Sequence, residues 1–395
     1  MKITAITLIL LIFWLLNFLG LTDFSHTVLL LVLVPGFIQA MSNKKLRKDA
    51  MSKPFMVTVV GLILCSVSSY VYEGQSVFQC FNGLAGLLPL FLFYYFLKAY
   101  KVQKDTILKA LKYAGIIYCI FYLLNYICII YGFSLIHVSD KALEIGIDAR
   151  VRIPGSMLIA YLFFSSLSTF ILQRKRKELL LCVLALSVIL VMAFRTMIAG
   201  IALCAILELF YLKGVSKSIF GYVIIGTVVV IVLYNVPIIK QKVDYMVSKQ
   251  EEKSQTFEDK DYIRWITYEY FTEHFFANNT EKVLGSGPTG YGSAYTKKLV
   301  ELQESGLYMV DWGLVGESWK YGIITIAGWI WFSLIMITRK WNTKYKYLAI
   351  LYIYLLIISV TTVEFSRLGN WVIHAAVLYL INFCNLYSCK HTYKE

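Results

Sequence analysis

The sequence lacks the short motifs by which many soluble enzymes are recognised. It contains no P-loop, no glycine pattern of a dinucleotide-binding fold, no HExxH and no G-x-S-x-G nucleophile elbow. No internal repeat of about 20–50 residues is visible, so nothing indicates a solenoid or a propeller. Any chemistry must therefore come from residues that are scattered along the chain.

Histidine and cysteine are also scarce where a metal site would need them. The 395 residues include five histidines and eight cysteines. No cysteine falls between residues 237 and 321, and no CxxC spacing occurs. The cysteines lie in or beside apolar runs, where thiols serve as packing residues. We therefore expect no metal site and no cofactor.

Long apolar runs dominate the chain. Hydrophobic residues make up 58% of it, and the mean hydropathy is +0.66. Uncharged runs of about 18–20 residues predict membrane-spanning helices, and they do not alternate as barrel strands do. The predicted fold class is an all-α, polytopic membrane protein. The first apolar run has no signal-peptide cleavage site, so we expect it to be a helix of the mature protein. Twelve spans are expected, near residues 3–20, 24–41, 55–72, 80–97, 113–131, 157–172, 179–193, 197–212, 218–236, 322–338, 347–362 and 370–387.

The net charge of +14 is distributed as a topology signal and not as a nucleic-acid-binding patch. Lysine and arginine crowd the links near residues 44–53, 98–112, 174–177, 213–217 and 339–346, but are absent from 21–23 and 73–79. If the spans alternate, all the basic links fall on one side, which the positive-inside rule assigns to the cytoplasm. Both termini are then cytoplasmic, and no nucleic acid partner is expected.

One long polar stretch interrupts the apolar pattern and divides the chain into three regions. Residues 1–236 hold spans one to nine, residues 237–321 form a large extracytoplasmic loop, and residues 322–395 hold spans ten to twelve and a cytoplasmic tail. Val243–Asp259 is polar, and we expect a mobile tether there. Tyr262–Phe276 carries apolar and aromatic residues at helical spacing, which favours an amphipathic helix at the membrane interface. Leu284–Gly292 is rich in glycine and predicts a turn.

Arginines stand out on the extracytoplasmic side because that side is otherwise poor in basic residues. Arg195 lies between two apolar runs without an acidic neighbour, and such a charge is costly unless it is paired or wet. Arg150, Arg152 and Arg264 fall on the same side. The guanidinium fork matches phosphate oxygens, so these residues suit a pyrophosphate. The structural alternatives are snorkelling for Arg195, a topological flank for Arg152 and a solvated charge for Arg264.

Two carboxylates flank the stretch that closes the long loop, DWGLVGESWKYG. Asp311 or Glu317, partly desolvated and near arginines, could act as a general base. The alternative is an ordinary helix cap or ion pair. His274, near Arg264, is a further candidate acid or base. Glu364 and Arg367 are expected to form a structural pair.

Aromatic residues are dense in the long loop. Trp265, Tyr268 and Trp312 could stack on sugar rings, which makes them candidate substrate-binding residues. Aromatic rings also mark membrane interfaces, so this signal has a purely structural alternative.

Together these features resemble the bacterial O-antigen and capsular polysaccharide polymerase and ligase superfamily. The resemblance depends on Arg152-Ile-Pro-Gly before a span, Phe-Arg-Thr at 194–196, Arg264-Trp265, Gly285-Ser-Gly287 and the loop-closing stretch. It covers roughly residues 150–323, and the span number and loop position agree along the whole chain. The ligase branch places a histidine where this chain has Asp311, and the form Asp-x-Gly-x-x-Gly is similar to the polymerase branch.

The resemblance implies a GT-C-like membrane glycosyltransferase of the bacterial inner membrane. Its substrates would be undecaprenyl-pyrophosphate-linked glycans, joined by metal-independent, inverting transfer without a cofactor. Asp311 would be the base, and Arg195 and Arg264 would stabilise the departing pyrophosphate. Arg150, Arg152, Trp265, Tyr268, His274, Trp312 and Glu317 would bind substrate. The bilayer and a chain-length regulator protein would be partners.

Two alternatives remain open at this point. A ligase would transfer the glycan to a different acceptor. A flippase or transporter would move the lipid-linked glycan, but such proteins place broken helices or repeated halves around a midplane site. This chain instead concentrates its polar residues outside the spans, which favours the polymerase.

Overall fold

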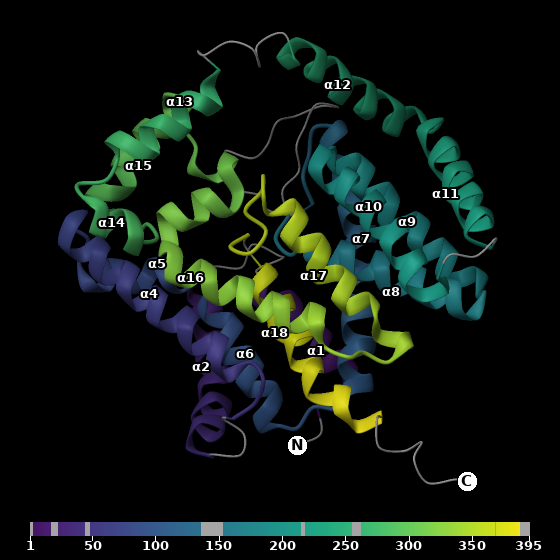
Figure 1. Ribbon diagram of the computed structural model, residues 1–395, viewed down its shortest axis with the longest axis horizontal. Coiled ribbons are helices and arrows are strands. Elements are labelled where there is room, and N and C mark those ends of the chain that lie inside the picture. Colours follow the sequence, from purple (N-terminus) through teal and green to yellow (C-terminus); the bar gives the residue numbers. More distant parts are fainter. Residues whose placement is uncertain are drawn as a thin grey trace.

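The computed structural model describes residues 3–16, 23–43, 48–135, 153–214, 218–254, 262–367 and 369–387. Within these ranges the chain forms helices and no strand, as the sequence predicted (Figure 1). The first half contains α1 (Ala5–Leu15), α2 (Asp23–Ser42), α4 (Ser52–Tyr72), α5 (Val77–Leu84), α6 (Leu88–Ala99), α7 (Lys104–Ile130), α8 (Met157–Gln173), α9 (Arg176–Met192) and α10 (Arg195–Lys213). The second half contains α11 (Ser218–Tyr234), α12 (Pro237–Ser254), α13 (Ile263–Glu269), η2 (Tyr270–His274), α14 (Asn279–Leu284), α15 (Ala294–Glu304), η3 (Met309–Trp312), α16 (Gly313–Thr338), η4 (Thr343–Tyr345), α17 (Tyr347–Ile358), α18 (Asn370–Tyr379) and η5 (Leu380–Tyr387).

Four stretches among the described residues are long and apolar enough to cross a membrane. They are Ser52–Tyr72, Lys104–Ile130, Arg195–Lys213 and Met309–Thr338. Two bent helix pairs, α5 with α6 and α11 with α12, raise the number to six if each pair is one span. These helices are those of a membrane-embedded protein. The arrangement of twelve spans with one large loop stays a prediction.

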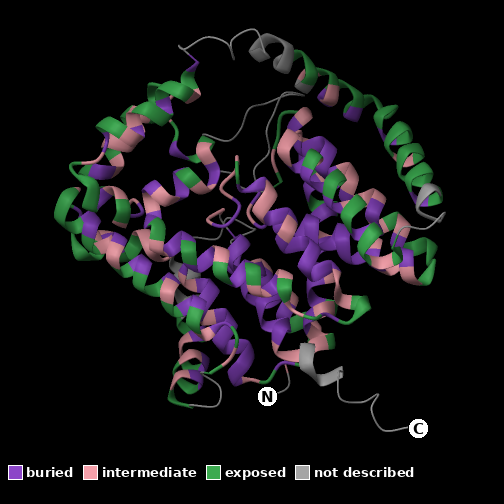
Figure 2. Cartoon of the chain, in the orientation of Figure 1, coloured by how far each residue is buried: buried purple, intermediate pink, exposed green. Residues whose placement is uncertain are grey.

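The surface of these helices carries the side chains that a bilayer accepts. Along α11, Ile224 is 62% exposed and Val232 is 61% exposed, and α1 and α4 also present isoleucine, leucine and valine outward. Figure 2 shows this pattern as exposed α11 and α12 beside a buried centre formed by α6, α8, α17 and α18. Exposed apolar area on this scale is unfavourable in water, so lipid is the solvent that fits it.

Glycine lets α4 and α16 pack at very short distance. A Cβ added at Gly61 would lie 2.4 Å from the Thr325 hydroxyl, and one added at Gly328 would lie 2.3 Å from the Thr58 hydroxyl. Small residues at a helix–helix interface allow this approach in a membrane, where packing replaces the hydrophobic effect. The α4–α16 pair therefore fixes the span that follows the long loop.

Two stretches differ in detail from what the sequence indicated. Residues 80–97, expected as a span, are bent, because α5 and α6 meet at 60°. The stretch expected to be a tether, Val243–Asp259, is helical as far as Ser254, because these residues continue α12, which leaves α11 at a 92° bend. Lysine, glutamine and glutamate are good helix formers, so a polar composition did not indicate a loop here. Residues 255–259 lie outside the described part.

The later part of the long loop folds around a small core of its own. Phe271, Phe275, Tyr295, Met309 and Trp319 are buried together, with the Phe271 and Trp319 rings stacked 5.4 Å apart. The helix predicted over Tyr262–Phe276 is present as α13 and η2, and it turns Phe271 and Phe275 inward. In Figure 1, α13, α14 and α15 lie along one edge of the molecule, next to α4 and α5.

The glycine-rich turn joins this small core to the membrane helices. Ser286 and Gly287 donate backbone N–H groups to the carbonyl oxygens of Trp319 (2.9 Å) and Lys320 (2.8 Å). At Gly285, φ is +85°, and an added Cβ would lie 2.4 Å from the Gly322 nitrogen. Gly322 has φ +80° and ψ 156°, and it bends α16 at this contact.

We predict that Gly285→Ala destabilises the protein through this contact. Gly132→Ala is the matched control, because Gly132 has a similar φ of +89° but nothing within 4 Å of an added Cβ. Both variants share the left-handed backbone strain, so their difference measures crowding, which costs about 1–3 kcal/mol in a packed site. Thermal unfolding of the purified protein in detergent should show a clearly lower midpoint for Gly285→Ala. Equal midpoints would contradict the backbone contact.

Candidate functional site

A buried ion pair organises the segment between α17 and α18. The Arg367 Nη2 atom lies 2.7 Å from the Glu364 Oε1 atom, and their side chains are 21% and 2% exposed. Asn370 donates from its amide nitrogen to the Glu364 backbone carbonyl at 2.9 Å and to its carboxylate at 3.2 Å. The expected pairing of Glu364 with Arg367 is confirmed.

Glu317 brings the end of the long loop to this ion pair. Its Oε1 atom accepts a hydrogen bond from the Ser366 backbone N–H at 2.8 Å. The residue is 2% exposed, and its Oε2 atom is buried without a hydrogen-bond partner among the described residues. A buried carboxylate oxygen with unused acceptor capacity is costly, so it marks a place where a polar ligand could bind.

Two segments from earlier in the chain contact Arg367 of this ion pair. Arg367 donates to the Ser156 hydroxyl at 3.4 Å, and its guanidinium lies 5.4 Å from the Phe194 ring centroid. Ser156 directly precedes α8, and Phe194 forms the tip between α9 and α10. We call Ser156, Phe194, Glu317, Glu364, Ser366, Arg367 and Asn370 the polar network. The polar network connects the end of the loop to three other segments, all of which were predicted from the sequence to lie on the extracytoplasmic side.

Arg195 is the first residue of α10 and directly follows the polar network residue Phe194. The chain reverses at Ala193, whose φ of +54° is unusual for a residue with a side chain. A positive side chain at a helix N-terminus opposes the helix dipole, so helix stability does not explain an arginine here. Its position at the tip is consistent with a role in binding anions.

Arg150 and Arg152 lie outside the described residues, but the segment that follows them is anchored. Tyr118 donates its hydroxyl to the Ile153 carbonyl oxygen at 2.8 Å. Gly155, with φ +92°, is in close contact with Leu16, and Ser156 belongs to the polar network.

Three aromatic residues of the loop form a second group together with Arg264. We call this group the aromatic platform; its members are Arg264, Trp265, Tyr268 and Trp312. The Trp312 ring lies 4.9 Å from that of Tyr268 and 5.8 Å from that of Trp265, centroid to centroid. Its Nε1–H donates to the Arg264 carbonyl oxygen at 3.1 Å. Trp265 and Tyr268 are 51% and 40% exposed, so their ring faces remain available. Exposed, fixed rings of this kind suit stacking on sugars or insertion at a membrane interface.

A backbone contact joins the aromatic platform to the polar network. Leu314 donates its N–H to the Ser359 carbonyl oxygen at 2.7 Å, and Ser359 ends α17 just before the Glu364–Arg367 segment. A Cβ at Gly313, where φ is +49°, would lie 2.2 Å from the same oxygen. Glycine is therefore required here, and it fixes Trp312 beside the segment that carries the ion pair.

Asp311 lies at the edge of this assembly. It is exposed, and it precedes Trp312 in the short helix η3. The ion pairs between described residues are Lys98–Asp49, Lys112–Glu178, Lys298–Glu73 and Arg367–Glu364, so Asp311 and Arg264 belong to none of them. Both side chains thus keep their charges available to a ligand.

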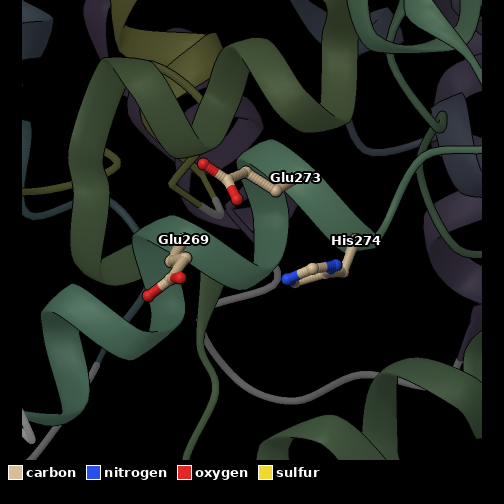
Figure 3. A group of neighbouring side chains, drawn as sticks. All are labelled: Glu269, Glu273 and His274. Atoms are coloured by element: carbon tan, nitrogen blue, oxygen red, sulfur yellow. The ribbon is translucent and has the colours of Figure 1, made fainter.

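His274 belongs to a separate, exposed group with Glu269 and Glu273 (Figure 3). One ligand atom from each residue lies within 4.8 Å of the others, so the three could hold a metal ion. They come from α13 and the following π-turn η2. All three side chains, two carboxylates and one imidazole, are exposed and keep their own hydration, so they make a weak site. No hydrogen bond or ion pair between described residues connects this group to the polar network.

A buried charge cluster that the sequence analysis missed attaches the loop to α4. Lys298 donates to both carboxylate oxygens of Glu73, at 3.0 and 3.1 Å, and lies 4.3 Å from the Phe275 ring centroid. Glu281 accepts from the Ala277 N–H at 2.7 Å, and its burial raises the pKa of this carboxyl. The sequence feature that could have indicated this cluster is Glu73, an acidic residue in a link that contains no lysine or arginine.

The structure thus gathers the predicted residues into two connected groups and one separate one. Glu317 and the tip bearing Arg195 belong to the polar network, and Arg264, Trp265, Tyr268 and Trp312 belong to the aromatic platform with Asp311 beside it. His274 stands apart. No protein-family model matches the chain, and no curated protein sequence matches it.

We predict that Arg367→Met destabilises the protein by about 3–5 kcal/mol, because it leaves the Glu364 carboxylate buried without its partner. The double variant Glu364→Gln/Arg367→Met should recover part of this loss. A double-mutant cycle on thermal or denaturant unfolding in detergent measures the coupling. Arg176→Met, at an exposed arginine, should have little effect. Additive effects of the two single changes would contradict a coupled pair.

Proposed function

We propose that this protein is a membrane glycosyltransferase that polymerises undecaprenyl-pyrophosphate-linked repeat units into a surface polysaccharide, an O-antigen or a capsule. The observation that carries the proposal is the connection of the polar network to the aromatic platform through the Gly313–Ser359 contact. This connection puts an arginine-bearing helix tip, a buried glutamate and exposed aromatic rings into one continuous region. Glycan transfer from a lipid pyrophosphate needs all three kinds of group.

The arginines supply the electrostatic part of the reaction. The donor is the growing chain, whose anomeric carbon carries the lipid pyrophosphate. As that bond breaks, negative charge develops on the departing phosphate oxygen, and fixed cations lower the barrier by stabilising it. Arg195 at the α10 tip and Arg264 on α13 take this role, with Arg150 and Arg152 as further contacts. Arg367 is neutralised by Glu364 and serves to hold the region together.

The carboxylates supply the proton acceptor. The hydroxyl oxygen of an incoming lipid-linked repeat unit attacks the anomeric carbon, the bond to the pyrophosphate breaks, and its electron pair leaves with the phosphate. The hydroxyl proton passes to Asp311, which is exposed and unpaired among the described residues. A single displacement inverts the anomeric configuration. Trp265, Tyr268 and Trp312 bind sugar rings, and Glu317 positions the acceptor through its free oxygen.

The proposal includes a location. A lipid-linked substrate requires a membrane, and the apolar helices meet that requirement. We place the protein in the bacterial inner membrane with twelve spans, both termini in the cytoplasm and the loop outside. The lipid-linked glycans and the bilayer are then its partners, with a chain-length regulator protein acting on the product.

We predict that Arg195→Ala and Arg264→Ala each abolish long glycan chains while the protein still inserts. Loss of one charge-stabilising contact lowers turnover by about 100- to 1000-fold. Lysine at either position should restore little, because it keeps the charge and loses the bidentate contact. The measurement is the glycan ladder of a deletion strain that carries each variant, with membrane levels checked by immunoblot. Arg176→Ala is the control.

The same deletion strain separates the three candidate functions. Loss of a polymerase leaves single repeat units on the surface, whereas loss of a flippase removes them. Loss of a ligase leaves polymer that is not attached to its acceptor. A normal ladder from Arg195→Ala and Arg264→Ala would contradict the proposed site.

We predict that Asp311→Asn lowers chain extension by about 100- to 10,000-fold, the usual contribution of a general base. The substitution should leave binding of the lipid pyrophosphate unchanged, since the arginines remain. Extension can be followed with purified protein and a lipid-linked repeat unit. If Asp311→Asn is fully active and Glu317→Gln is not, Glu317 is the base.

A further inference from the structure

A polar pocket lies at the other end of the molecule from the long loop. In Figure 1 the ends of α6 and η5 lie at the bottom, whereas α13–α15 lie at the upper left. The pocket has a volume of about 250 Å³, which is room for several water molecules or for a phosphate group. Its wall includes Lys48, Asp49, Lys98, Lys101, Asn382 and Phe383.

Asp49, the acid among the described residues of this wall, already accepts hydrogen bonds from other groups. The Asp49 Oδ1 atom accepts from the Met51 backbone N–H at 2.9 Å and from the Ser52 hydroxyl at 3.0 Å. Its Oδ2 atom accepts from the Tyr94 hydroxyl and from the Lys98 ammonium group. Asp49 therefore neutralises Lys98 and has no capacity for a further cation.

Lys98 is built into the structure and is not an ordinary surface lysine. It is 7% exposed, and its ammonium nitrogen lies 5.7 Å from the ring centroids of both Tyr94 and Tyr95. The positive-inside rule explains why lysines occur in a cytoplasmic link. It does not explain why three lysines surround one pocket, or why one of them is buried in the pocket wall. Lys48 and Lys101, both exposed, add two charges that Asp49 does not balance.

The remaining wall indicates what kind of anion fits. Phe383 provides an apolar flank, and its ring packs against that of Tyr379 at 5.4 Å. The Asn382 amide donates to the Tyr379 carbonyl oxygen at 3.0 Å, which fixes it at the rim. A basic pocket with an apolar edge, at the ends of apolar helices, matches a headgroup phosphate whose acyl chains continue along the helices.

We propose that this pocket binds the phosphate group of an anionic phospholipid from the membrane leaflet on the side opposite the long loop. Lys48 and Lys101 contact the phosphate oxygens as flexible point charges, and Lys98 with Asp49 forms the fixed floor. The acyl chains lie beside Phe383. This lipid stabilises the junction of α6 with α18 and η5. The site is independent of the glycan chemistry at the other end.

The test uses the full-length protein purified in detergent and titrated with phosphatidylglycerol, with phosphatidylcholine as the uncharged comparison. Phosphatidylglycerol should raise the melting temperature of the wild type, and phosphatidylcholine should not. Lys48→Gln/Lys101→Gln should weaken phosphatidylglycerol binding by roughly 30-fold, about fivefold for each lysine near an anionic lipid. Lys175→Gln/Lys177→Gln changes the net charge equally at exposed positions outside the pocket and should bind like the wild type.

Three outcomes would overturn the proposal. The first is equal stabilisation by both lipids, and the second is equal loss of binding in the two charge-matched variants. The third concerns the source of the phosphate: an excess of inorganic phosphate that stabilises the wild type as well as phosphatidylglycerol does would assign the pocket to a soluble ligand. These three outcomes do not depend on whether the Arg195 variants lose chain extension, so the lipid site and the proposed function are tested separately.

Discussion

The bend at Gly322 is the constraint on which the rest of the structure depends. With φ +80° and ψ 156°, this residue bends α16 between the segment that bears Glu317 and Trp319 and the remainder of the helix. The bend is held by backbone contacts, since an added Cβ at Gly322 would lie 2.2 Å from the Leu284 carbonyl oxygen. Beyond it, α16 packs closely on α4. The bend thus connects the loop core, the membrane body and the candidate site.

Ion pairs hold together segments of the chain that carry the candidate site and the basic pocket. Three of the four ion pairs among the described residues join segments that are distant in sequence: Glu73 with Lys298, Asp49 with Lys98 and Glu178 with Lys112; in the fourth, Glu364 and Arg367 are three positions apart. Each pair has at least one buried partner, so it contributes to the position of a segment more than to net stability. Asp311 and Arg264 stand outside these ion pairs.

Local patterns predicted what depends on short stretches of sequence. The helical class, the helix over Tyr262–Phe276, the glycine turn at Leu284–Gly292 and the Glu364–Arg367 pair all follow from composition and spacing, and the structure contains them. The helical structure of Val243–Ser254 was not predicted, because its polar composition was taken as the sign of a tether. The 60° break between α5 and α6 was missed because apolar content does not report helix direction.

The sequence by itself determined that this is a helical, membrane-embedded chain with one long polar stretch, because apolar run length and charge are properties of neighbouring residues. It also identified Arg195, Arg264, Asp311 and Glu317 as candidates one at a time. Only the tertiary structure decided which of them meet. The Glu317 carboxylate accepts a hydrogen bond from the Ser366 backbone N–H, 49 positions away, and a backbone contact at Gly313 fixes Trp312 against the end of α17. Such long-range contacts leave no periodic signal in the sequence. The basic pocket has the same origin, since three helix ends form it and none of them shows it alone.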